Sequence, residues 1–455
     1  MAVLRRYTPE EARATLLRRV PIDEREVPRA LLESLAQTFG EPVTPDQAVA
    51  RILADVRRRG DAALHDWTER LDHVRLPMFR VPDAQVQAAL EALPADLRAS
   101  LTLAAERIRA FHAREPVTSW LTQDLGGTLG MLIRPLERVG IYIPGGRAPL
   151  PSTVLMTAIP ARVAGVDRVI MVTPPRPETR YGDTWPAHPA ILAAAALARV
   201  DEVYLVGGAQ AIAALAYGTE SIPQVDKIVG PGNLFVTLAK KQVFGRVGID
   251  GLAGPTETLI LADETANPAW VAADLLAQAE HDPLAAAILL TPSESLLDAV
   301  DAALAAQIPQ RARRAIIEAA LAGRSGAVLT RDLDEALALA NAYAAEHVAL
   351  AVADPWSLVP RLRHAGCVFV GEHSYEVLGD YLAGPNHVLP TDGTARFASA
   401  LSVWDFVKRM GLVALDPATA RELGPHAARL ADTEALDAHA AAARIREAGA
   451  VQQRA

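Results

Sequence analysis

Hydrophobic and polar residues follow a helical period in the first quarter of this 455-residue chain. From residue 9 to about residue 113, Leu, Val and Ala recur at helical spacing, and charged residues fill the positions between them. The charged faces of residues 10–19 and 46–59 are typical of this stretch. The pattern predicts an N-terminal arm followed by helices that cover a core.

Downstream, the pattern changes to that of buried strands separated by helices. Short β-rich runs at 140–143, 169–173, 202–206 and 227–230 alternate with alanine-rich helical stretches. A second set of strands is expected at 258–261, 286–290, 327–329, 347–352 and 367–370. The proline-rich stretch 174–189 is expected to be an exposed loop. Because such alternation is typical of βαβ units on parallel sheets, an α/β fold with two units is predicted.

The C-terminal tail has a helical pattern at 434–448 and no partner strand nearby in sequence, as is common for tails that dock on another subunit. Within it, Glu434 and His439 are separated by about 140° of rotation on a continuous helix, which is poor geometry for one ligand. Either one of them precedes the helix, or the two bind different atoms.

Composition narrows the class of protein. Apolar residues make up 51% of the chain and charged residues 22%, which is ordinary for a folded globular protein. The net charge is −9 and no Lys/Arg cluster stands apart from acidic neighbours, so no nucleic-acid partner is expected. No apolar run approaches about 20 residues without a break, so no membrane span is expected. The single cysteine, Cys367, and a start without a signal-like apolar segment favour the cytoplasm.

A nucleotide site is indicated by glycine turns rather than by the usual G-x-G-x-x-G motif, which is absent. Three such turns, at 143–146, 206–210 and 229–233, follow predicted strands of one α/β unit. Any one of them is explained by a tight turn, for which glycine is the default residue. Three together favour a ligand at the carboxyl ends of the strands.

Polar residues at the end of one helix suggest a metal site. A helix is predicted to start at Asn267, with proline next, and to stop before Pro283. Gln278 and His281 lie three residues apart in its last turn, so an amide oxygen and an imidazole could reach one metal ion. Taken alone, the pair also fits a solvated helix end.

Two further polar pairs allow more than one interpretation. Asp380 and His387 lie in a loop-like stretch, 379–391, where a polar surface loop is an equal alternative. Glu346 and His347 stand at a helix-to-strand junction, where a carboxylate and an imidazole could serve base chemistry or simply compensate a helix dipole. The residues alone indicate an α/β enzyme with an N/O-ligated metal and a nucleotide, and they leave the reaction open.

From about Val20 to Arg446, the order and spacing of motifs resemble the histidinol dehydrogenase family. The matching stretches are GIYIPGGRAPLPSTVLM at 140–156, VGGAQAIAALAYGT at 206–219, residues 225–257, DLLAQAEHDP at 274–283, EHVAL at 346–350, GDYLAGPNHVLPT at 379–391, LSVWDFVKR at 401–409 and EALDAHAAAARIR at 434–446. Each candidate polar group named above falls inside one of them.

The resemblance implies a zinc- and NAD-dependent, four-electron oxidation of L-histidinol through the aldehyde to L-histidine. Its zinc ligands would be Gln278, His281, Asp380 and His439, with the last contributed by the partner subunit of a homodimer. The imidazole and amine of the substrate would complete the zinc shell.

The resemblance also assigns the remaining roles. His347 would be the general base and Glu346 would activate water for hydration of the aldehyde. The implied substrate-binding residues are Thr256, Gln278, His281, His347, Asp380, His387, Glu434 and His439, and the implied NAD contacts are Tyr142, Gln210 and Asn233. The family pattern usually has serine at 256, glycine at 282 and proline at 345, where this chain has Thr256, Asp282 and Ala345. Cys367 matches no catalytic position.

We therefore expect two Rossmann-like parallel-sheet domains with an N-terminal helical arm and a C-terminal helical tail. The expected parts are an arm at 1–29, a first α/β domain at 30–141 plus 256–400 with the zinc and catalytic residues, a second, NAD-binding α/β domain at 142–255, and a dimerisation tail at 401–455.

Three alternatives remain open at this stage. A relative of the same fold could oxidise another primary alcohol, such as a sulfonated diol, although Glu434 and His387 favour histidinol. A zinc hydrolase could use metal-bound water with Glu346 as base. A non-catalytic binding protein could keep the architecture, which the intact Glu346 and His347 disfavour.

Overall fold

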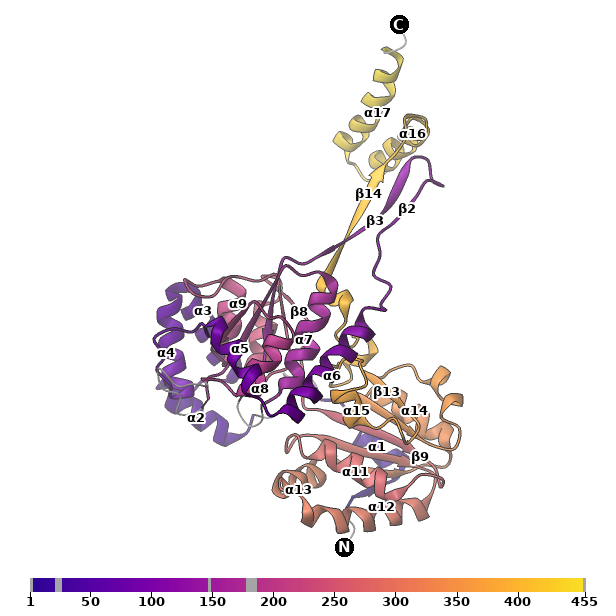
Figure 1. The fold of residues 1–455 in the computed structure, drawn as a ribbon. Helices are drawn as coiled ribbons and strands as arrows, with labels where there is room; N and C mark the ends of the chain where they lie inside the picture. Colours follow the sequence, from indigo (N-terminus) through magenta and orange to yellow (C-terminus); the bar gives the residue numbers. More distant parts are fainter. Residues whose placement is uncertain (1–2, 21–26, 146–148, 177–185, 453–455) are drawn as a thin grey trace. The chain divides into compact units, whose positions relative to one another are not determined.

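A computed structural model describes residues 3–20, 27–145, 149–176 and 186–452, with side chains described as far as Arg446. The α/β class is confirmed, because parallel sheets alternate with helices along the chain (Figure 1). Most of the predicted loop at 174–189 and one residue of the first glycine turn, Gly146, lie outside the described residues. No helix within the described ranges is long and apolar enough to cross a membrane.

The larger sheet has six parallel strands in the order β1-β11-β10-β9-β12-β13. Its strands are β1 (Arg6–Tyr7), β9 (Glu257–Ala262), β10 (Ala286–Thr291), β11 (Gly326–Leu329), β12 (His347–Ala351) and β13 (Cys367–Val370). The five downstream strands lie where the sequence pattern placed them. Strand β1 was not predicted, and it joins the N-terminal arm to the edge of this sheet through pairing with β11.

The second parallel sheet has the order β6-β5-β4-β7-β8. Its strands are β4 (Arg138–Tyr142), β5 (Arg168–Thr173), β6 (Glu202–Leu205), β7 (Lys227–Val229) and β8 (Gly248–Ile249). All but the short β8 were predicted.

The helices α1 to α15 of the described chain fall into three groups in sequence order. The N-terminal helices are α1 (Pro9–Ala14), α2 (Arg29–Phe39), α3 (Pro45–Arg59), α4 (Asp61–Asp72), α5 (Asp83–Ala92) and α6 (Ala95–His112). Between strands of the five-stranded sheet lie α7 (Pro151–Ala164), α8 (Pro189–Leu197), α9 (Gly208–Tyr217) and, before β8, α10 (Leu234–Val243). The six-stranded sheet carries α11 (Pro268–Ala279), α12 (Glu294–Gln307), α13 (Arg314–Gly323), α14 (Leu333–Tyr343) and α15 (Glu376–Tyr381). Short 3-10 turns are at Ile308–Gln310, Pro355–Ser357, Val359–Arg361, Thr394–Arg396 and Val403–Phe406.

Side-chain caps explain where two functionally placed helices begin. Asn267 accepts hydrogen bonds from the backbone N–H groups of residues 269 and 270, with Pro268 in the first turn of α11, as predicted. Asp332 accepts from the N–H of Glu335 at the start of α14. These caps fix where the two helices begin. Helix α11 then places Gln278 in its last turn, and α14 ends three residues before Glu346.

Helices α3 to α6 pack with the five-stranded sheet, whereas α1 packs at the six-stranded sheet, and this corrects the expected domain boundaries. Helix α3 packs on α9, α5 on α8 and α6 on α7, and their buried side chains share one core with residues 139–247. The sequence-based boundaries had joined residues 30–141 to 256–400 instead. Helical periodicity shows which face of a helix is buried, but not which apolar surface covers it.

Residues 116–135 and 407–455 form a separate small unit. Strands β2 (Trp120–Thr122), β3 (Thr128–Pro135) and β14 (Val407–Ala414) make an antiparallel sheet, followed by helices α16 (Pro417–Thr433) and α17 (Asp437–Gln452). The two helices pack through Ala428, Ala431 and Ala440. Strand β14 of the tail therefore pairs with β3, which lies far back in the sequence (Figure 1). The sequence pattern showed that no partner strand is nearby in sequence, but it did not indicate this distant one. The tail boundary moves from residue 401 to 407.

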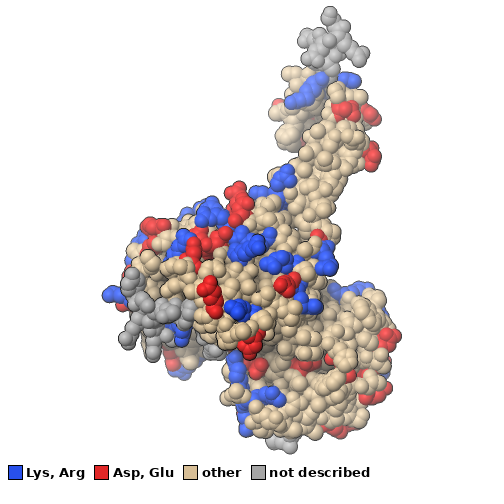
Figure 2. Space-filling model, in the orientation of Figure 1, with Lys and Arg blue, Asp and Glu red and all other residues tan. Residues whose placement is uncertain are grey.

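Charged residues of both signs are interspersed on the face of the molecule in Figure 2. No extended patch of a single charge sign is visible on that face.

Candidate active site

The predicted catalytic pair lies at the amino-terminal edge of the six-stranded sheet. His347 is the first residue of β12, and it pairs in register with Thr258 of β9 and Cys367 of β13. Helix α14 ends at Tyr343, and Ala344 takes a left-handed conformation with φ 55° that turns the chain toward the strand. Ligands of parallel sheets usually bind at the carboxyl edge, so this location departs from the general rule.

Glu346 is held by two donors from the start of β9. The hydroxyl of Thr256 donates to its Oε2 at 2.6 Å, and the N–H of Glu257 donates to the same oxygen at 2.9 Å. The amide nitrogen of Gln278 in turn donates to the Thr256 hydroxyl at 2.9 Å. Burial raises the pKa of the Glu346 carboxyl to about 7, although the neighbouring imidazole and both hydrogen bonds act in the opposite direction.

His347 is buried and its two ring nitrogens have different surroundings. Nδ1 lies 3.1 Å from the carbonyl oxygen of Glu257, which can only accept, so Nδ1 carries a proton. Nε2 lies 3.8 Å from Oδ1 of Asp380. Burial lowers the pKa of the imidazole, but the carboxylates of Glu376, Glu346 and Asp380 outweigh it and raise that pKa to about 9.

Asp380 and His387 belong to the segment that follows β13, the last strand of this sheet in the sequence. Asp380 belongs to helix α15 rather than to a loop, which corrects the prediction for that residue, whereas His387 is in the loop that follows. Nδ1 of His387 lies 2.9 Å from the Asp380 carbonyl oxygen, and its Nε2 lies 3.3 Å from the hydroxyl of Thr153 in α7. Burial lowers the pKa of His387.

Donors suited to a metal ion are present, but they are not already gathered as a cluster of acidic, histidine and cysteine residues. Oε1 of Gln278 is buried and has no hydrogen-bond partner among the described residues. Nδ1 of His281 lies 2.9 Å from the carbonyl oxygen of Ala277, which leaves Nε2 available, and the side chain is exposed. Within the described ranges, no three His, Cys, Asp or Glu side chains are placed together to hold a metal.

Electrostatics nonetheless indicate that the predicted groups lie near one another. The charges of Asp380, His347 and His281 all act on the imidazole of His387. Glu376 is buried in the first turn of α15, and the charges of His347, Asp380 and His281 all act on the pKa of its carboxyl. Charge interactions of this kind reach about 10 Å, so these side chains lie in the same region of the larger unit.

The two predicted tail residues lie in the small unit. Glu434 caps the end of α16, Ala435 has φ 59°, and His439 is in the first turn of α17. The alternative in which Glu434 precedes the helix is therefore correct. Their predicted contact with substrate and metal stays a prediction.

The predicted nucleotide residues lie at the carboxyl edge of the five-stranded sheet. Tyr142 ends β4, and its hydroxyl accepts the N–H of Gly208 at 3.2 Å. Gln210 is fully buried, and its Oε1 has no hydrogen-bond partner among the described residues. Asn233 caps α10 with its side-chain oxygen, and its amide nitrogen takes no part in the cap. A Cβ on Gly230 would stand 2.3 Å from the Tyr142 carbonyl oxygen, so glycine is required there for packing alone.

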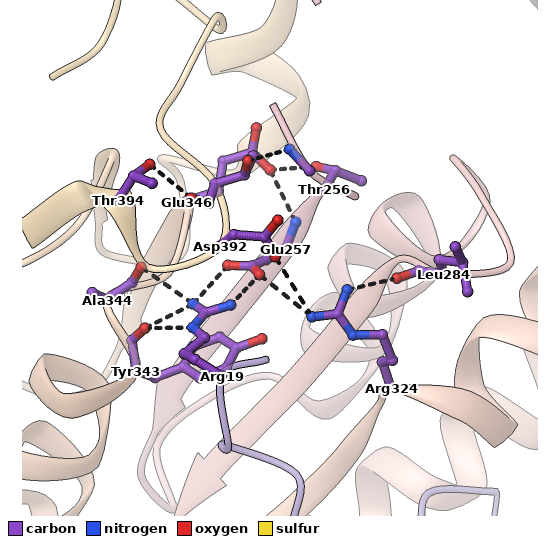
Figure 3. Close-up of polar contacts among 12 residues, drawn as sticks. Arg19, Thr256, Glu257, Leu284, Arg324, Tyr343, Ala344, Glu346, Asp392 and Thr394 are labelled. Atoms are coloured by element: carbon purple, nitrogen blue, oxygen red, sulfur yellow. Dashed lines mark hydrogen bonds and ion pairs between the residues drawn. The ribbon is translucent and has the colours of Figure 1, made fainter. Parts of the chain in front are cut away.

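Three residues that the sequence pattern did not single out complete the site. Glu257 opens strand β9 with its side chain fully buried, and the guanidinium of Arg19 binds its carboxylate (Figure 3). Glu376 adds a second buried carboxylate beside His347. An acidic residue at the start of an otherwise apolar strand, in the segment ETLILA, was the one signal that pointed to Glu257.

Fold and site together define an α/β enzyme in which an adjacent carboxylate and imidazole lie at a buried sheet edge that also presents amide, imidazole and carboxylate side chains. The profile of the family described as histidinol dehydrogenase matches residues 41–447. The chain belongs to the histidinol dehydrogenase family, whose members are oxidoreductases, and the resemblance of the motifs is confirmed.

Individual relatives agree over nearly the whole chain. The histidinol dehydrogenase of Deinococcus radiodurans is 52% identical over 438 residues, which cover 96% of this chain and 98% of that protein. That of Chromobacterium violaceum is 52% identical over 414 residues, 90% of this chain and 94% of that protein. The crystal structure of histidinol dehydrogenase from Elizabethkingia anophelis matches with a TM-score of 0.88 at 35% identity and covers 98% of both chains.

Proposed function

We propose that this protein is a zinc- and NAD-dependent histidinol dehydrogenase that oxidises L-histidinol through L-histidinaldehyde to L-histidine. The observation that carries the proposal is the joint anchoring of Glu346 and His347 on the main chain of Glu257, with Nε2 of His347 left facing Asp380. A carboxylate and an imidazole in fixed, different surroundings suit two proton transfers in one cycle.

Each oxidation needs a base in this scheme. In the first, Nε2 of His347 takes the hydroxyl proton while hydride leaves the carbinol carbon. In the second, the Glu346 carboxylate takes a proton from water as that water adds to the aldehyde, and the carbonyl oxygen takes the proton that His347 holds from the first oxidation. The resulting hydrate then loses a second hydride, and Nε2 of the again neutral His347 takes its hydroxyl proton. With a pKa of about 7, Glu346 is partly ionised near neutral pH, which suits a base that must also release its proton. Bound NAD supplies the hydride acceptor, one molecule for each oxidation.

The zinc ligands in this proposal are Gln278, His281, Asp380 and His439 of the partner subunit. The buried Oε1 of Gln278, which has no hydrogen-bond partner in the described part of the chain, fits a group awaiting a ligand atom. An amide oxygen, imidazole nitrogen and carboxylate oxygen are all suitable donors for zinc. Bound zinc would hold the amine and imidazole of the substrate, and its charge would offset the carboxylates around His347.

Substrate and cofactor contacts follow from the same placement. Thr256, His387 and Glu434 join the zinc ligands and His347 as substrate-binding residues. Thr256 keeps the hydroxyl of the usual serine, and that hydroxyl is already bonded to Glu346, so the added methyl group leaves the network intact. Tyr142, Gln210 and Asn233 would contact NAD at the carboxyl edge of the five-stranded sheet.

A homodimer is proposed because the small unit exposes much apolar surface. Its exposed side chains include Leu121 at 58%, Leu125 at 66%, Val413 at 74%, Leu430 at 68% and Ile445 at 69%. Among the residues whose side chains are described, the buried apolar cluster of this unit consists of alanines. Such a balance is typical of a surface that a partner covers, and a second copy of the chain would bring His439 to the site.

The test is a coupled assay of the zinc-loaded protein with L-histidinol and NAD. Absorbance should show NADH forming in a ratio of two per histidinol consumed, with histidine as product. NADP, a sulfonated diol and other primary alcohols serve as competing substrates. Preference for another alcohol would transfer the assignment to that substrate, and hydrolysis without NADH would replace it with a zinc hydrolase.

A further inference from the structure

Arg19 belongs to the N-terminal arm and reaches the interior beside the active site. It lies just beyond α1, and its side chain is 22% exposed. The arm is held by β1 at the sheet edge and by Tyr7, Ala12 and Leu17, which are buried in the core under the six-stranded sheet. The arm is thus part of the domain, so the position of Arg19 is fixed by packing.

The guanidinium of Arg19 makes a two-sided clamp (Figure 3). On one side Nη1 and Nη2 bind the two oxygens of the Glu257 carboxylate, with Nη2 at 2.8 Å from Oε2. On the other side Nε and Nη2 donate to the carbonyl oxygen of Tyr343 at 3.0 and 2.7 Å. Nη2 also lies 3.3 Å from the carbonyl oxygen of Ala344, and the guanidinium stacks 3.6 Å above the Tyr343 ring.

The clamp joins the two segments that carry the catalytic pair. Glu257 begins β9, and its own N–H and C=O bind Glu346 and His347. Tyr343 and Ala344 end α14, directly before the chain reaches Glu346. A single side chain therefore sets the spacing between the residue that anchors the pair and the backbone that leads into it.

We propose that Arg19 is a positioning residue for the catalytic pair, acting through Glu257. The proposal rests on the proposed roles of Glu346 and His347. It does not make Arg19 a catalytic residue, because Arg19 touches neither member of the pair.

Charge explains why Arg19 is needed. The Glu257 side chain has no exposure, and a buried carboxylate without a counter-charge is strongly unfavourable. The other cation nearby, Arg324, is 3.8 Å from the carboxylate and also faces Asp392. Without the bidentate fork of Arg19, the buried Glu257 carboxylate loses its main counter-charge, and we expect the side chain and its main chain to shift. Lysine keeps the charge but cannot bind both carboxylate oxygens and two carbonyls together.

The kinetic test uses the zinc-loaded full-length protein with L-histidinol and NAD. Arg19→Ala should lower kcat roughly 10- to 100-fold, with KM values and zinc content near wild type, because a small displacement of catalytic groups has effects of this size. The kcat of Arg19→Lys should lie between those of wild type and Arg19→Ala. Added guanidinium ion should restore part of the kcat of Arg19→Ala. Adding Glu257→Gln to Arg19→Ala should cause little further loss, since both changes break one link.

The matched control is Arg168→Gln. Arg168 also pairs with a nearly buried carboxylate, Glu202, but in the five-stranded sheet. The Arg168→Gln variant should be less stable than wild type but keep the wild-type kcat. If Arg19→Ala behaves in the same way, with reduced stability and wild-type kcat, the proposal is wrong. A loss confined to KM or to zinc content would also overturn it. If Arg19→Ala does not fold, Arg19→Lys is judged by the same kcat criterion.

A second readout does not depend on activity. In protein labelled with nitrogen-15, the Nδ1–H signal of His347 should change in Arg19→Ala and stay unchanged in Arg168→Gln. An inactive wild-type protein would refute the proposed function, whereas an unchanged His347 signal in Arg19→Ala would refute the role of Arg19.

Discussion

Nδ1 of His347 lies 3.1 Å from the carbonyl oxygen of Glu257, and this contact determines which ring nitrogen can act as a base. The carbonyl accepts, so the proton is on Nδ1 and the lone pair of neutral His347 is on Nε2, toward Asp380. The neighbouring N–H of the same residue, Glu257, binds Glu346. One peptide segment therefore orients both members of the pair.

Replacing His347 should remove the base without removing the metal. We expect His347→Asn to lower kcat by about 100- to 10,000-fold, the usual contribution of a general base. Zinc content, measured by atomic emission, should stay near wild type, because His347 is not among the proposed ligands. Wild-type turnover in this variant would show that another group takes the hydroxyl proton.

Replacing His281 should have the opposite signature. His281→Asn removes an imidazole whose Nε2 is available beyond the end of α11, so zinc occupancy should fall together with turnover. Excess zinc should restore part of the activity, which it should not do for His347→Asn. If zinc stays bound and only kcat falls, the roles of the two histidines are exchanged.

Complementation between inactive subunits should test the shared site. His347→Asn and His439→Asn dimers are each expected to be inactive when pure. After mixing under conditions that allow subunit exchange, about one quarter of wild-type activity should return, because half of the dimers are mixed and each mixed dimer has one intact site. No recovery despite exchange, followed by mass spectrometry, would place His439 in the site of its own subunit or outside any site.

Asp274 should make stability depend on pH. Burial, together with the neighbouring charges of Glu376 and Glu372, raises the pKa of the Asp274 carboxyl to about 7. A carboxyl whose pKa is raised in the folded state stabilises that state most when it is protonated. Its contribution to the free energy of unfolding is therefore largest below about pH 4 and declines as pH rises toward 7. Asp274→Asn should therefore stabilise the protein by about 1–2 kcal/mol at pH 8, after allowance for partial exposure.

Urea unfolding at pH 8 and at pH 4 measures this difference. The gain from Asp274→Asn should be present at pH 8 and much smaller at pH 4, where the carboxyl is protonated in the folded chain and about half protonated in the unfolded chain. A gain of equal size at both pH values would mean that the substitution acts through packing or helix propensity rather than through charge.

Much of the secondary structure was readable from local pattern. Strand β5 is buried after its first residue and β10 is buried throughout, and both are mainly apolar runs that end in threonine. Asn267 and Asp332 are helix caps, whose hydrogen bonds reach only a few residues along the chain. The spacing of Gln278 and His281 likewise followed from helix geometry. The roles assigned to these and the other site residues came from resemblance to a family, because spacing alone left several interpretations open.

Other features depended on contacts between distant segments. Nothing near Arg19 in the sequence indicates that it binds Glu257. Strands β3 and β14 pair although most of the α/β region lies between them in the sequence. The helices at 45–112 show their apolar faces in the sequence, but the five-stranded sheet that they cover was identified only by packing. The active-site edge was likewise decided by the way β9, β12 and β13 bring their first residues together.

The sequence by itself determined the α/β class, the order of the strands along the chain, and the residue types available for proton transfer and metal binding, because backbone periodicity and capping are local. Tertiary structure decided which charges compensate one another, which sheet each helix covers, and which nitrogen of His347 is free. These depend on side chains brought within a few ångströms by the fold, and neither periodicity nor residue spacing carries that information.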